Sequence, residues 1–317
     1  MYKFNIGLLI FSITPILFIS RLHFSTYLQT KKTQVFNTTD IIIYNRVPKC
    51  GSTLIMKTFI DLSQNKNFRV ESQQTPTMNK RIGPESHRFQ SSEEEAKWQE
   101  SIKIRKKPTI IIRHQWFSKF QEKRIKYINF VRDPIERSIS GYYFMRYGRE
   151  DCNVTEENPR WKLVRKFRSR IDQRTIGMNL DDCVKKFQDN LKTCIRLEFL
   201  QFFCGNTLKC KDDNDYALIQ AKQNIAEEYS IVGYLENVEG FLKTLESKMP
   251  GWFGGVMESY KRIYKKAKQT ELTKCKYQHP PKDETLEILR KKMWREVELY
   301  KFITDRFDQN WGSKINQ

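Results

Sequence analysis

The hydrophobic and polar positions of the chain alternate between short apolar runs and longer amphipathic stretches. Four apolar runs, rich in Ile, Val, Tyr and Phe, are bounded by polar residues, a pattern typical of buried strands. They cover residues 41–44, 109–112, 125–131 and 230–234. We therefore expect four buried strands.

Apolar positions with helical spacing follow most of these runs. They predict helices over residues 53–63, 134–147, 236–247 and 285–307. The polar stretch 64–107 predicts a further helix with long connections. Strands that alternate with helices favour an α/β fold with a mostly parallel sheet and helices on both faces. Ligands in such folds bind at the carboxyl ends of the strands.

The amino terminus carries a separate signal. Residues 4–20 are mostly apolar, Lys3 is the one charged residue of the first twenty, and no small-residue cleavage site follows. This favours an uncleaved signal-anchor helix over a cleaved signal peptide. We expect a cytoplasmic tip and transmembrane anchor over 1–20, a stem over 21–40 and a lumenal domain over 41–317. The short span suits an early secretory or Golgi membrane, with single-pass type II topology.

Cysteines and glycosylation sequons support a lumenal domain. The sequence has seven cysteines, and four of them form two pairs that are close in sequence: Cys183 with Cys194, and Cys204 with Cys210. In a membrane-anchored chain such pairs favour disulfides over zinc ligands, because no CxxC spacing accompanies them. Sequons begin at Asn37 and Asn153, which we expect to be N-glycosylated.

The net charge of the chain restricts the classes of partner that it can bind. The sequence has 57 Lys and Arg against 37 Asp and Glu, a formal net charge of +20. Such an excess points to nucleic acid, an anionic membrane surface or an acidic polysaccharide. A lumenal domain disfavours nucleic acid and leaves the acidic polysaccharide as the expected partner.

The loop after the first strand carries the first chemical motif. Residues 46–53, RVPKCGST, join a buried strand to a helix, as in loops that hold a phosphate with backbone N–H groups. Lys49 supplies a charge, and Ser52 and Thr53 supply hydroxyls. The lysine precedes the glycine, so this is not a Walker loop, which counts against a kinase. The alternative is an ordinary glycine turn with a solvated lysine.

Two further segments follow strand ends. Arg132 leaves the third strand, and Ser140 lies two helical turns later, so both could reach one phosphate. The alternative is an Arg-Asp pair that caps the helix. His114 follows the second strand, where a lone histidine is more often structural than catalytic.

Together these motifs resemble one enzyme family. YNRVPKCGST at 44–53, VRDPIERSISGYYFMRYG at 131–148 and QFFCG at 201–205 are similar to the glycosaminoglycan uronyl 2-O-sulfotransferases. That family includes heparan sulfate 2-O-sulfotransferases and uronyl 2-sulfotransferases. The resemblance covers about residues 41–310 and implies a P-loop-like sulfotransferase fold. It also implies 3′-phosphoadenosine 5′-phosphosulfate (PAPS) as sulfuryl donor, PAP as product, and a homotrimer.

The resemblance also implies roles for individual residues. The family's first loop holds the 5′-phosphosulfate, here through Arg46, Lys49, Cys50, Gly51, Ser52 and Thr53. Arg132 and Ser140 correspond to the residues that hold the 3′-phosphate, and the paired cysteines correspond to disulfides. His114 corresponds to the catalytic base, with Lys49 neutralising the leaving oxygen. The heparan branch has His-Gly-His at this position, whereas this sequence has Arg113-His114 and lacks the first histidine. This departure is closer to the uronyl branch, which acts on dermatan and chondroitin.

The acceptor site is expected to be basic, because the polymer carries carboxylates and sulfates. Candidate contacts are Arg46, Lys57, Arg113, Arg137, Arg146, Arg165, Lys166 and Arg168, with a second basic run at 261–268. The expected reaction transfers a sulfuryl group to the 2-hydroxyl of iduronate or glucuronate in dermatan, chondroitin or heparan sulfate, without a metal. The alternative is a non-catalytic heparin-binding membrane protein on a degenerate sulfotransferase scaffold.

Overall fold

The computed structural model describes four stretches of the chain, residues 40–72, 88–147, 161–269 and 280–311. The predicted anchor, most of the stem, both sequons, Cys152 and Cys275 lie outside them. Within the described stretches, no helix combines the length and apolar character needed to span a membrane.

Five parallel strands form the central sheet, in the order β2-β3-β1-β4-β5. They are β1 (Ile41–Asn45), β2 (Arg69–Ser72), β3 (Thr109–Arg113), β4 (Ile125–Val131) and β5 (Tyr229–Tyr234). The chain leaves central β1 toward one edge and returns after β3 to its other side. Ligands of open parallel sheets bind where the strand order reverses in this way. The ends of β1, β3 and β4 therefore converge at the expected place for a site.

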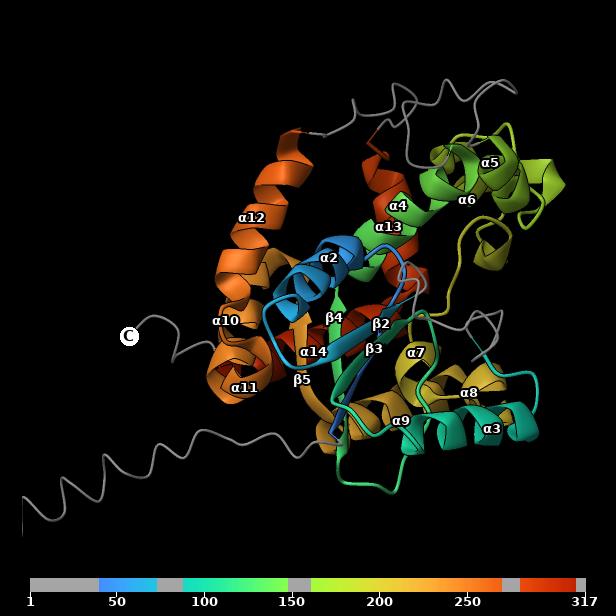
Figure 1. The fold of residues 1–317 in the computed structure, drawn as a ribbon. Coiled ribbons are helices and arrows are strands. Elements are labelled where there is room, and N and C mark those ends of the chain that lie inside the picture. The colour runs from blue at the N-terminus through green and yellow to red at the C-terminus, as the bar shows by residue number, and fades with distance from the viewer. Residues whose placement is uncertain (1–39, 73–87, 148–160, 270–279, 312–317) are drawn as a thin grey trace, which may run out of the picture. The chain divides into compact units, whose positions relative to one another are not determined.

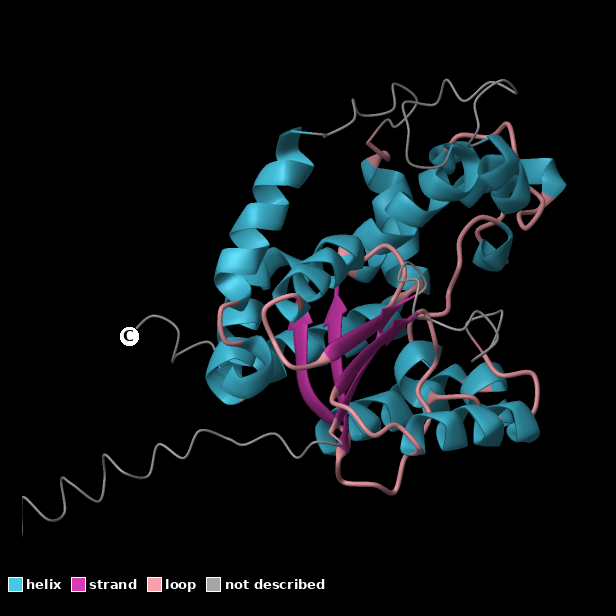
Figure 2. Cartoon of the chain, viewed as in Figure 1, coloured by secondary structure: helices cyan, strands magenta, loops and turns pink. Residues whose placement is uncertain are grey.

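Helices cover both faces of the sheet (Figures 1 and 2). Ile42 and Tyr44 of β1 face a core built with α2 (Ser52–Ser63), α10 (Val238–Lys248), α11 (Pro250–Phe253) and α12 (Val256–Gln269). Ile41 and Ile43 face a core built with α3 (Ser92–Lys103), α7 (Gln201–Cys204), α8 (Leu208–Asp212), α9 (Asn214–Glu227) and α14 (Trp294–Trp311). Alternate strand residues point to opposite faces, so both sets of helices are needed to bury β1.

A third apolar cluster lies beyond the carboxyl ends of the strands (Figure 1). It is built mainly from α4 (Pro134–Tyr147), α6 (Leu180–Lys186) and α13 (Asp283–Lys292). Helix α5 (Trp161–Arg168) and the short turns η1 (Gln173–Thr175) and η2 (Leu191–Thr193) lie in the same part of the chain, and η3 (Leu235–Asn237) follows β5. This cluster forms a separate support for the loops above the sheet.

The predicted α/β fold with a parallel sheet is confirmed, as are all four predicted strands. Strand β2 was missed because its four residues, RVES, alternate between exposed and buried rather than forming an apolar run. The predicted single helix over 285–307 was wrong: α13 ends at Lys292 and α14 begins at Trp294. Met293 packs into the third cluster, whereas Leu299 and Ile303 pack against the sheet. The two helices serve different cores, so the chain turns between them.

Candidate active site at the carboxyl ends of the strands

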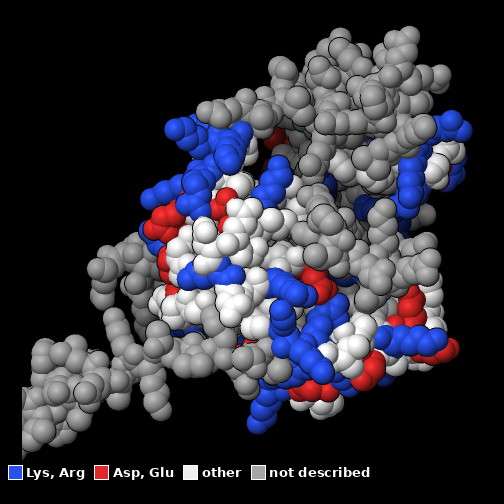
Figure 3. All heavy atoms as spheres, in the orientation of Figure 1, with Lys and Arg blue, Asp and Glu red and all other residues white. Residues whose placement is uncertain are grey.

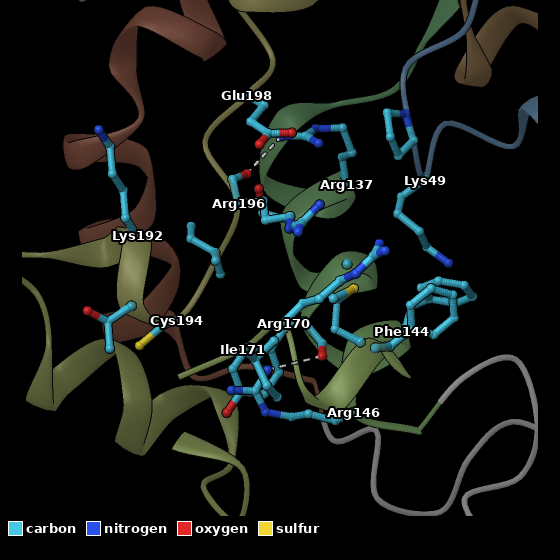
Figure 4. A pocket seen from close by; sticks show the side chains of 18 of the residues that line it. Lys49, Arg137, Phe144, Arg146, Arg170, Ile171, Lys192, Cys194, Arg196 and Glu198 are labelled. Atoms are coloured by element: carbon cyan, nitrogen blue, oxygen red, sulfur yellow. Dashed lines mark hydrogen bonds between the residues drawn. The ribbon is translucent and has the colours of Figure 1, made fainter. Parts of the chain in front are cut away.

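A cavity of about 450 Å³ lies above the sheet, between the loop after β1, helix α4 and residues 192–198 (Figure 4). Its cationic lining side chains are Lys49, Arg137, Arg146, Arg170, Lys192 and Arg196. The lining includes two carboxylates, Asp172 and Glu198, and one histidine, His114. The cavity is therefore strongly basic and suits an anionic ligand.

The loop after β1 holds an unusual backbone. Lys49 has φ of 68° and Gly51 has φ of 69°, both in the left-handed region. A Cβ atom on Gly51 would lie 2.9 Å from a methyl carbon of Leu235, so only glycine fits there without a shift. A lysine held in the left-handed region is strained, and such strain is often found at functional sites.

Helix α2 begins directly after this loop with its N-terminus uncapped. Its N-cap residue is Gly51, which makes no side-chain cap, and the first turn contains no acidic residue. The first backbone N–H groups of a helix have no partner inside the helix and carry partial positive charge. The α2 N-terminus is therefore suited to hold a phosphate or phosphosulfate group.

Phe144 positions the amine of Lys49. The Lys49 Nζ atom lies 4.0 Å from the centre of the Phe144 ring, in a cation–π contact (Figure 4). Phe144 in turn packs against Phe167, with ring centroids 5.0 Å apart. All three side chains line the cavity. Helix α4 thus holds the lysine of the β1 loop at the cavity wall.

His114 follows β3 and lines the same cavity. Its Nδ1 atom lies 2.9 Å from the backbone carbonyl oxygen of Arg46. A carbonyl oxygen can only accept, so Nδ1 carries a proton, and in the neutral ring Nε2 keeps its lone pair. His114 is therefore set in the tautomer that a general base requires.

Arg46 contributes its backbone to this arrangement rather than its side chain. The side chain is buried, with Nη1 3.6 Å from the sulfur of Met56, and it does not line the cavity. Cys50 is a buried free cysteine, and burial raises the pKa of its thiol to about 12. Ser52 is buried and Thr53 is half-buried at the start of α2. The loop would thus meet an anion mainly through backbone groups and Lys49.

Helix α4 places two buried polar side chains at the cavity. Arg137 is buried and donates from Nη2 to the carbonyl oxygen of Arg196 at 3.2 Å. Burial lowers the pKa of its guanidinium, and the carboxylates Glu296 and Glu198 partly offset this. Neither the Arg137 Nε nor the Ser138 hydroxyl has a hydrogen-bond partner among the described residues. Buried polar groups are normally paired, so these two atoms are exceptions beside the cavity.

The predicted 3′-phosphate residues lie outside the cavity lining. Arg132 pairs with Glu136 at 2.9 Å, and Ser140 is half-buried further along α4. The Asp133 carboxylate accepts the backbone N–H of Ile135 and of Glu136, each at 2.9 Å, and so caps α4 without Arg132. Their role in binding the 3′-phosphate stays a prediction.

The other predicted acceptor contacts are dispersed. Arg146 lines the cavity, but two contacts fix its side chain. Its Nη2 donates a hydrogen bond to the Thr175 hydroxyl at 2.8 Å, and its Cζ lies 3.5 Å from the centre of the Tyr142 ring. Arg168 donates to the Arg146 carbonyl at 2.7 Å. Other members lie elsewhere: Lys57, Arg165 and Lys166 are exposed, and Arg113 is buried at the end of β3. The structure thus gathers Arg137 and Arg146, with Lys49 and His114, at one cavity.

The second basic run lies on α12, where Lys and Arg side chains gather on the surface (Figure 3). Arg262 of this run pairs with Asp61 of α2 at 2.6 Å. Residues 261–268 do not line the cavity. A role in polymer binding stays a prediction for them.

Both predicted disulfides are present, with Cα separations of 6.0 Å for Cys183–Cys194 and 5.8 Å for Cys204–Cys210. Cys194 lines the cavity, and the two bonds bracket the segment that follows it. The lining residues Ser138, Phe144, Lys192, Arg196 and Glu198 were not singled out from the sequence. The described residues contain no cluster of three or more His, Cys, Asp or Glu side chains that could hold a metal ion.

The comparisons with known proteins agree with this geometry. The chain is 31% identical over 277 residues to heparin sulfate O-sulfotransferase of Drosophila melanogaster, covering 85% of this chain and 72% of the relative. It is 30% identical over 274 residues to heparan sulfate 2-O-sulfotransferase 1 of Xenopus laevis, covering 84% and 70%. It is 27% identical over 269 residues to human uronyl 2-sulfotransferase, covering 84% of this chain but 62% of that relative.

A family match covers the same region. Residues 32–303 match the family described as the sulfotransferase family. That range contains the loop after β1, His114, helix α4 and both disulfides. The chain is therefore a sulfotransferase enzyme that belongs to the sulfotransferase family.

Proposed function

We propose that this enzyme transfers a sulfuryl group from PAPS to the 2-hydroxyl of a uronic acid in a glycosaminoglycan chain. The observation that carries the proposal is the pairing of His114 with the Arg46 carbonyl in a basic cavity that also contains Lys49. The names of the relatives, which include heparan sulfate 2-O-sulfotransferase and uronyl 2-sulfotransferase, support this acceptor class.

The residues present fit the two ends of the donor. The uncapped N-terminus of α2 and the Lys49 amine suit the phosphosulfate. We assign the 3′-phosphate to Arg132 and Ser140, which lie outside the cavity lining, with Arg132 paired to Glu136 at 2.9 Å. The cavity beside them, with Arg137 and the Ser138 hydroxyl, is left for the acceptor sugar.

The chemistry follows from these placements. PAPS supplies a sulfuryl group activated by its phosphate leaving group. Nε2 of His114 accepts the proton of the uronic acid hydroxyl as the new oxygen–sulfur bond forms. As the old sulfur–oxygen bond breaks, Lys49 and the α2 N–H groups stabilise the charge left on the phosphate oxygen. Each step uses groups that follow β1 or β3, which are neighbours in the sheet.

The finer assignments extend this proposal. Ile112 and Arg113 precede His114 where the heparan branch has His-Gly, a departure closer to the uronyl branch, and the acceptor is dermatan, chondroitin or heparan sulfate. The apolar residues 4–20, the two sequons and the disulfides support a type II anchor with the catalytic domain in the Golgi lumen. A homotrimer is expected from the family resemblance.

The decisive experiment is transfer of radiolabelled sulfate from PAPS onto desulfated heparin, dermatan and chondroitin, followed by disaccharide analysis. We expect label at the 2-position of a uronic acid in at least one polymer. Label at another position, or on an acceptor without uronic acid, would overturn the proposal. Protection of the protein from heat by PAP without transfer to any polymer would instead favour a binding protein on a sulfotransferase scaffold.

A further inference from the structure

A buried hydrogen-bond network lies at the start of the loop that follows β1. The β1–β4 ladder ends at the pair Tyr44 and Ile128. Asn45 and Asn129 are the next residues on these two strands, and both are 0% exposed. The Asn129 Nδ2 atom donates to the backbone carbonyl of Asn45 and to its Oδ1, each at 2.9 Å. Two side-chain amides thus bridge the strands at the point where their backbones stop pairing.

Asn45 is the centre of this network. Its Oδ1 also accepts the hydroxyl of Tyr229 on β5 at 3.0 Å, and its Nδ2 donates to the carbonyl oxygen of Phe202 on α7 at 2.9 Å. The same Phe202 carbonyl accepts the backbone N–H of Phe117 at 3.1 Å. Both polar atoms of the Asn45 side chain are therefore paired. A satisfied buried network of this kind holds its members in one arrangement.

The network contacts both chain segments that form the proposed base. Arg46 follows Asn45 directly, and its carbonyl accepts the hydrogen bond from Nδ1 of His114. Phe117 lies three residues after His114. The Phe202 carbonyl, which accepts from both segments, therefore links the residue before the carbonyl group to the chain just after the ring.

Helix α7 is a fixed anchor for this link. The Asn224 side chain of α9 donates to two carbonyl oxygens of α7, at 2.8 and 3.0 Å. The Cys204–Cys210 disulfide holds the last residue of the helix. Gly205 follows with φ of 114°, and a Cβ atom there would lie 3.1 Å from the Phe117 carbonyl oxygen. The QFFCG segment thus packs closely against the chain that follows β3.

We propose that Asn45 is a positioning residue for the general base. Through its backbone and the Phe202 carbonyl, it holds the carbonyl of Arg46 against Nδ1 of His114. This inference rests on the proposed function, in which Nε2 of His114 accepts the proton. Without that carbonyl as acceptor, a neutral imidazole carries its proton mainly on Nε2, which then cannot act as a base. Asn45 does not line the cavity, so it acts on the rate of transfer without touching either substrate.

The test compares two buried tyrosine hydroxyls whose residues are paired in register on β4 and β5. Tyr229→Phe removes the hydrogen bond to Asn45 Oδ1 and keeps the ring. Tyr127→Phe, the matched control, removes a hydroxyl that donates to the Ser118 carbonyl at 2.7 Å in the same core. Both should lower Tm by similar amounts, because each loses one buried hydrogen bond. Only Tyr229→Phe should lower kcat, by about three- to tenfold, with KM for PAPS unchanged.

Asn45→Ala removes the whole side chain and should lower kcat by about 100-fold. Heat protection by PAP checks that this variant is folded. If it shows none, the comparison of Tyr229→Phe with Tyr127→Phe decides the proposal.

A second measurement reports the proton on His114 directly. The nitrogen chemical shifts of the imidazole rings are recorded by NMR on the full chain with isotope-labelled histidine, and His114→Ala assigns the signals. In the neutral ring of the wild type, we expect the proton on Nδ1. Tyr229→Phe and a folded Asn45→Ala should show part of the signal of the Nε2–H tautomer, whereas Tyr127→Phe should keep the wild-type pattern.

The proposal is overturned if Tyr229→Phe keeps the wild-type kcat or the wild-type tautomer. It is also overturned if Tyr127→Phe loses as much kcat as Tyr229→Phe, because the effect is then one of core stability. A KM for PAPS that rises as much as kcat falls would likewise overturn it, since the disturbed element is then the phosphosulfate loop. Failure of the proposed function has a different signature. The tautomer then still changes in Tyr229→Phe, while the wild type transfers no sulfate to any acceptor.

Discussion

The backbone carbonyl of Arg46 accepts a hydrogen bond from Nδ1 of His114 at 2.9 Å. Arg46 follows β1 and His114 follows β3, which are neighbours in the sheet, with Asn45 opposite Arg113 in register. The parallel register therefore delivers the carbonyl to the histidine. The donor loop and the proposed base are joined by the same pair of strands.

Replacing His114 should separate chemistry from binding. In His114→Ala, the proton acceptor for the sugar hydroxyl is lost, so turnover should fall by about 100- to 10,000-fold. PAP should still protect the protein from heat, because the α2 N-terminus and Lys49 remain. The measurement is kcat beside the PAP-induced shift in Tm. An equal loss of nucleotide binding would show that His114 is a structural residue of the loop.

Lys49 should show opposite effects on turnover and stability. Lys49→Gly removes the amine and relieves the left-handed backbone, so the free energy of unfolding should rise by about 1 kcal/mol while turnover falls about 100-fold. Lys49→Ala loses the amine but keeps the strained backbone, so it should lose turnover without the gain in stability. Chemical denaturation and steady-state kinetics measure both. A Lys49→Gly variant with unchanged turnover would remove this lysine from the proposed mechanism.

Cys50 should make stability depend on alkaline pH. Burial raises the pKa of its thiol from 9.0 to about 12, so above pH 9 the folded state holds a proton that the unfolded state has released. The stabilising contribution is therefore complete below pH 9 and is lost as the pH rises. The slope between pH 9 and 12 is about 1.4 kcal/mol per pH unit from this group. Denaturant titrations of wild type and Cys50→Ala should differ by that slope, and a parallel pair of curves would contradict it.

Substitution of two serines of α4 should affect different substrates, one the acceptor and the other the sulfuryl donor. Ser138 is one of the lining residues of the cavity and its hydroxyl is buried without a partner among the described residues, whereas Ser140 does not line the cavity. Ser138→Ala should raise KM for the acceptor about three- to tenfold and leave KM for PAPS unchanged. Ser140→Ala should raise KM for PAPS instead. The reversed pattern would place the acceptor on the Ser140 side of the helix.

The sequence predicted those parts of the site that can be recognised from residues close together along the chain. The loop 46–53 was singled out because its strand, glycine and helix follow one another. His114 was singled out by its match to the family's catalytic histidine, since a lone histidine after a strand is more often structural. The cysteine pairs were close enough in sequence to suggest disulfides, and both disulfides are present.

Other features depended on contacts between distant parts of the chain. Phe144 reads as an ordinary aromatic residue of α4, and its role appears only when the fold brings it to Lys49. Residues 192–198 of the cavity carry no motif, and they are held by the Arg137–Arg196 hydrogen bond and the Cys183–Cys194 disulfide. The break at Met293 is marked by neither proline nor glycine, because two separate cores cause it rather than a local signal.

The two disulfides bracket residues 195–203, whereas the five described strands contain no cysteine. Ile195 packs in the third apolar cluster, whereas Phe202 and Phe203 pack against the sheet, so the bracketed segment connects two cores. Each disulfide restricts the chain at one end of that connection. An oxidising environment therefore stiffens this wall of the cavity from both ends, without a crosslink inside the sheet.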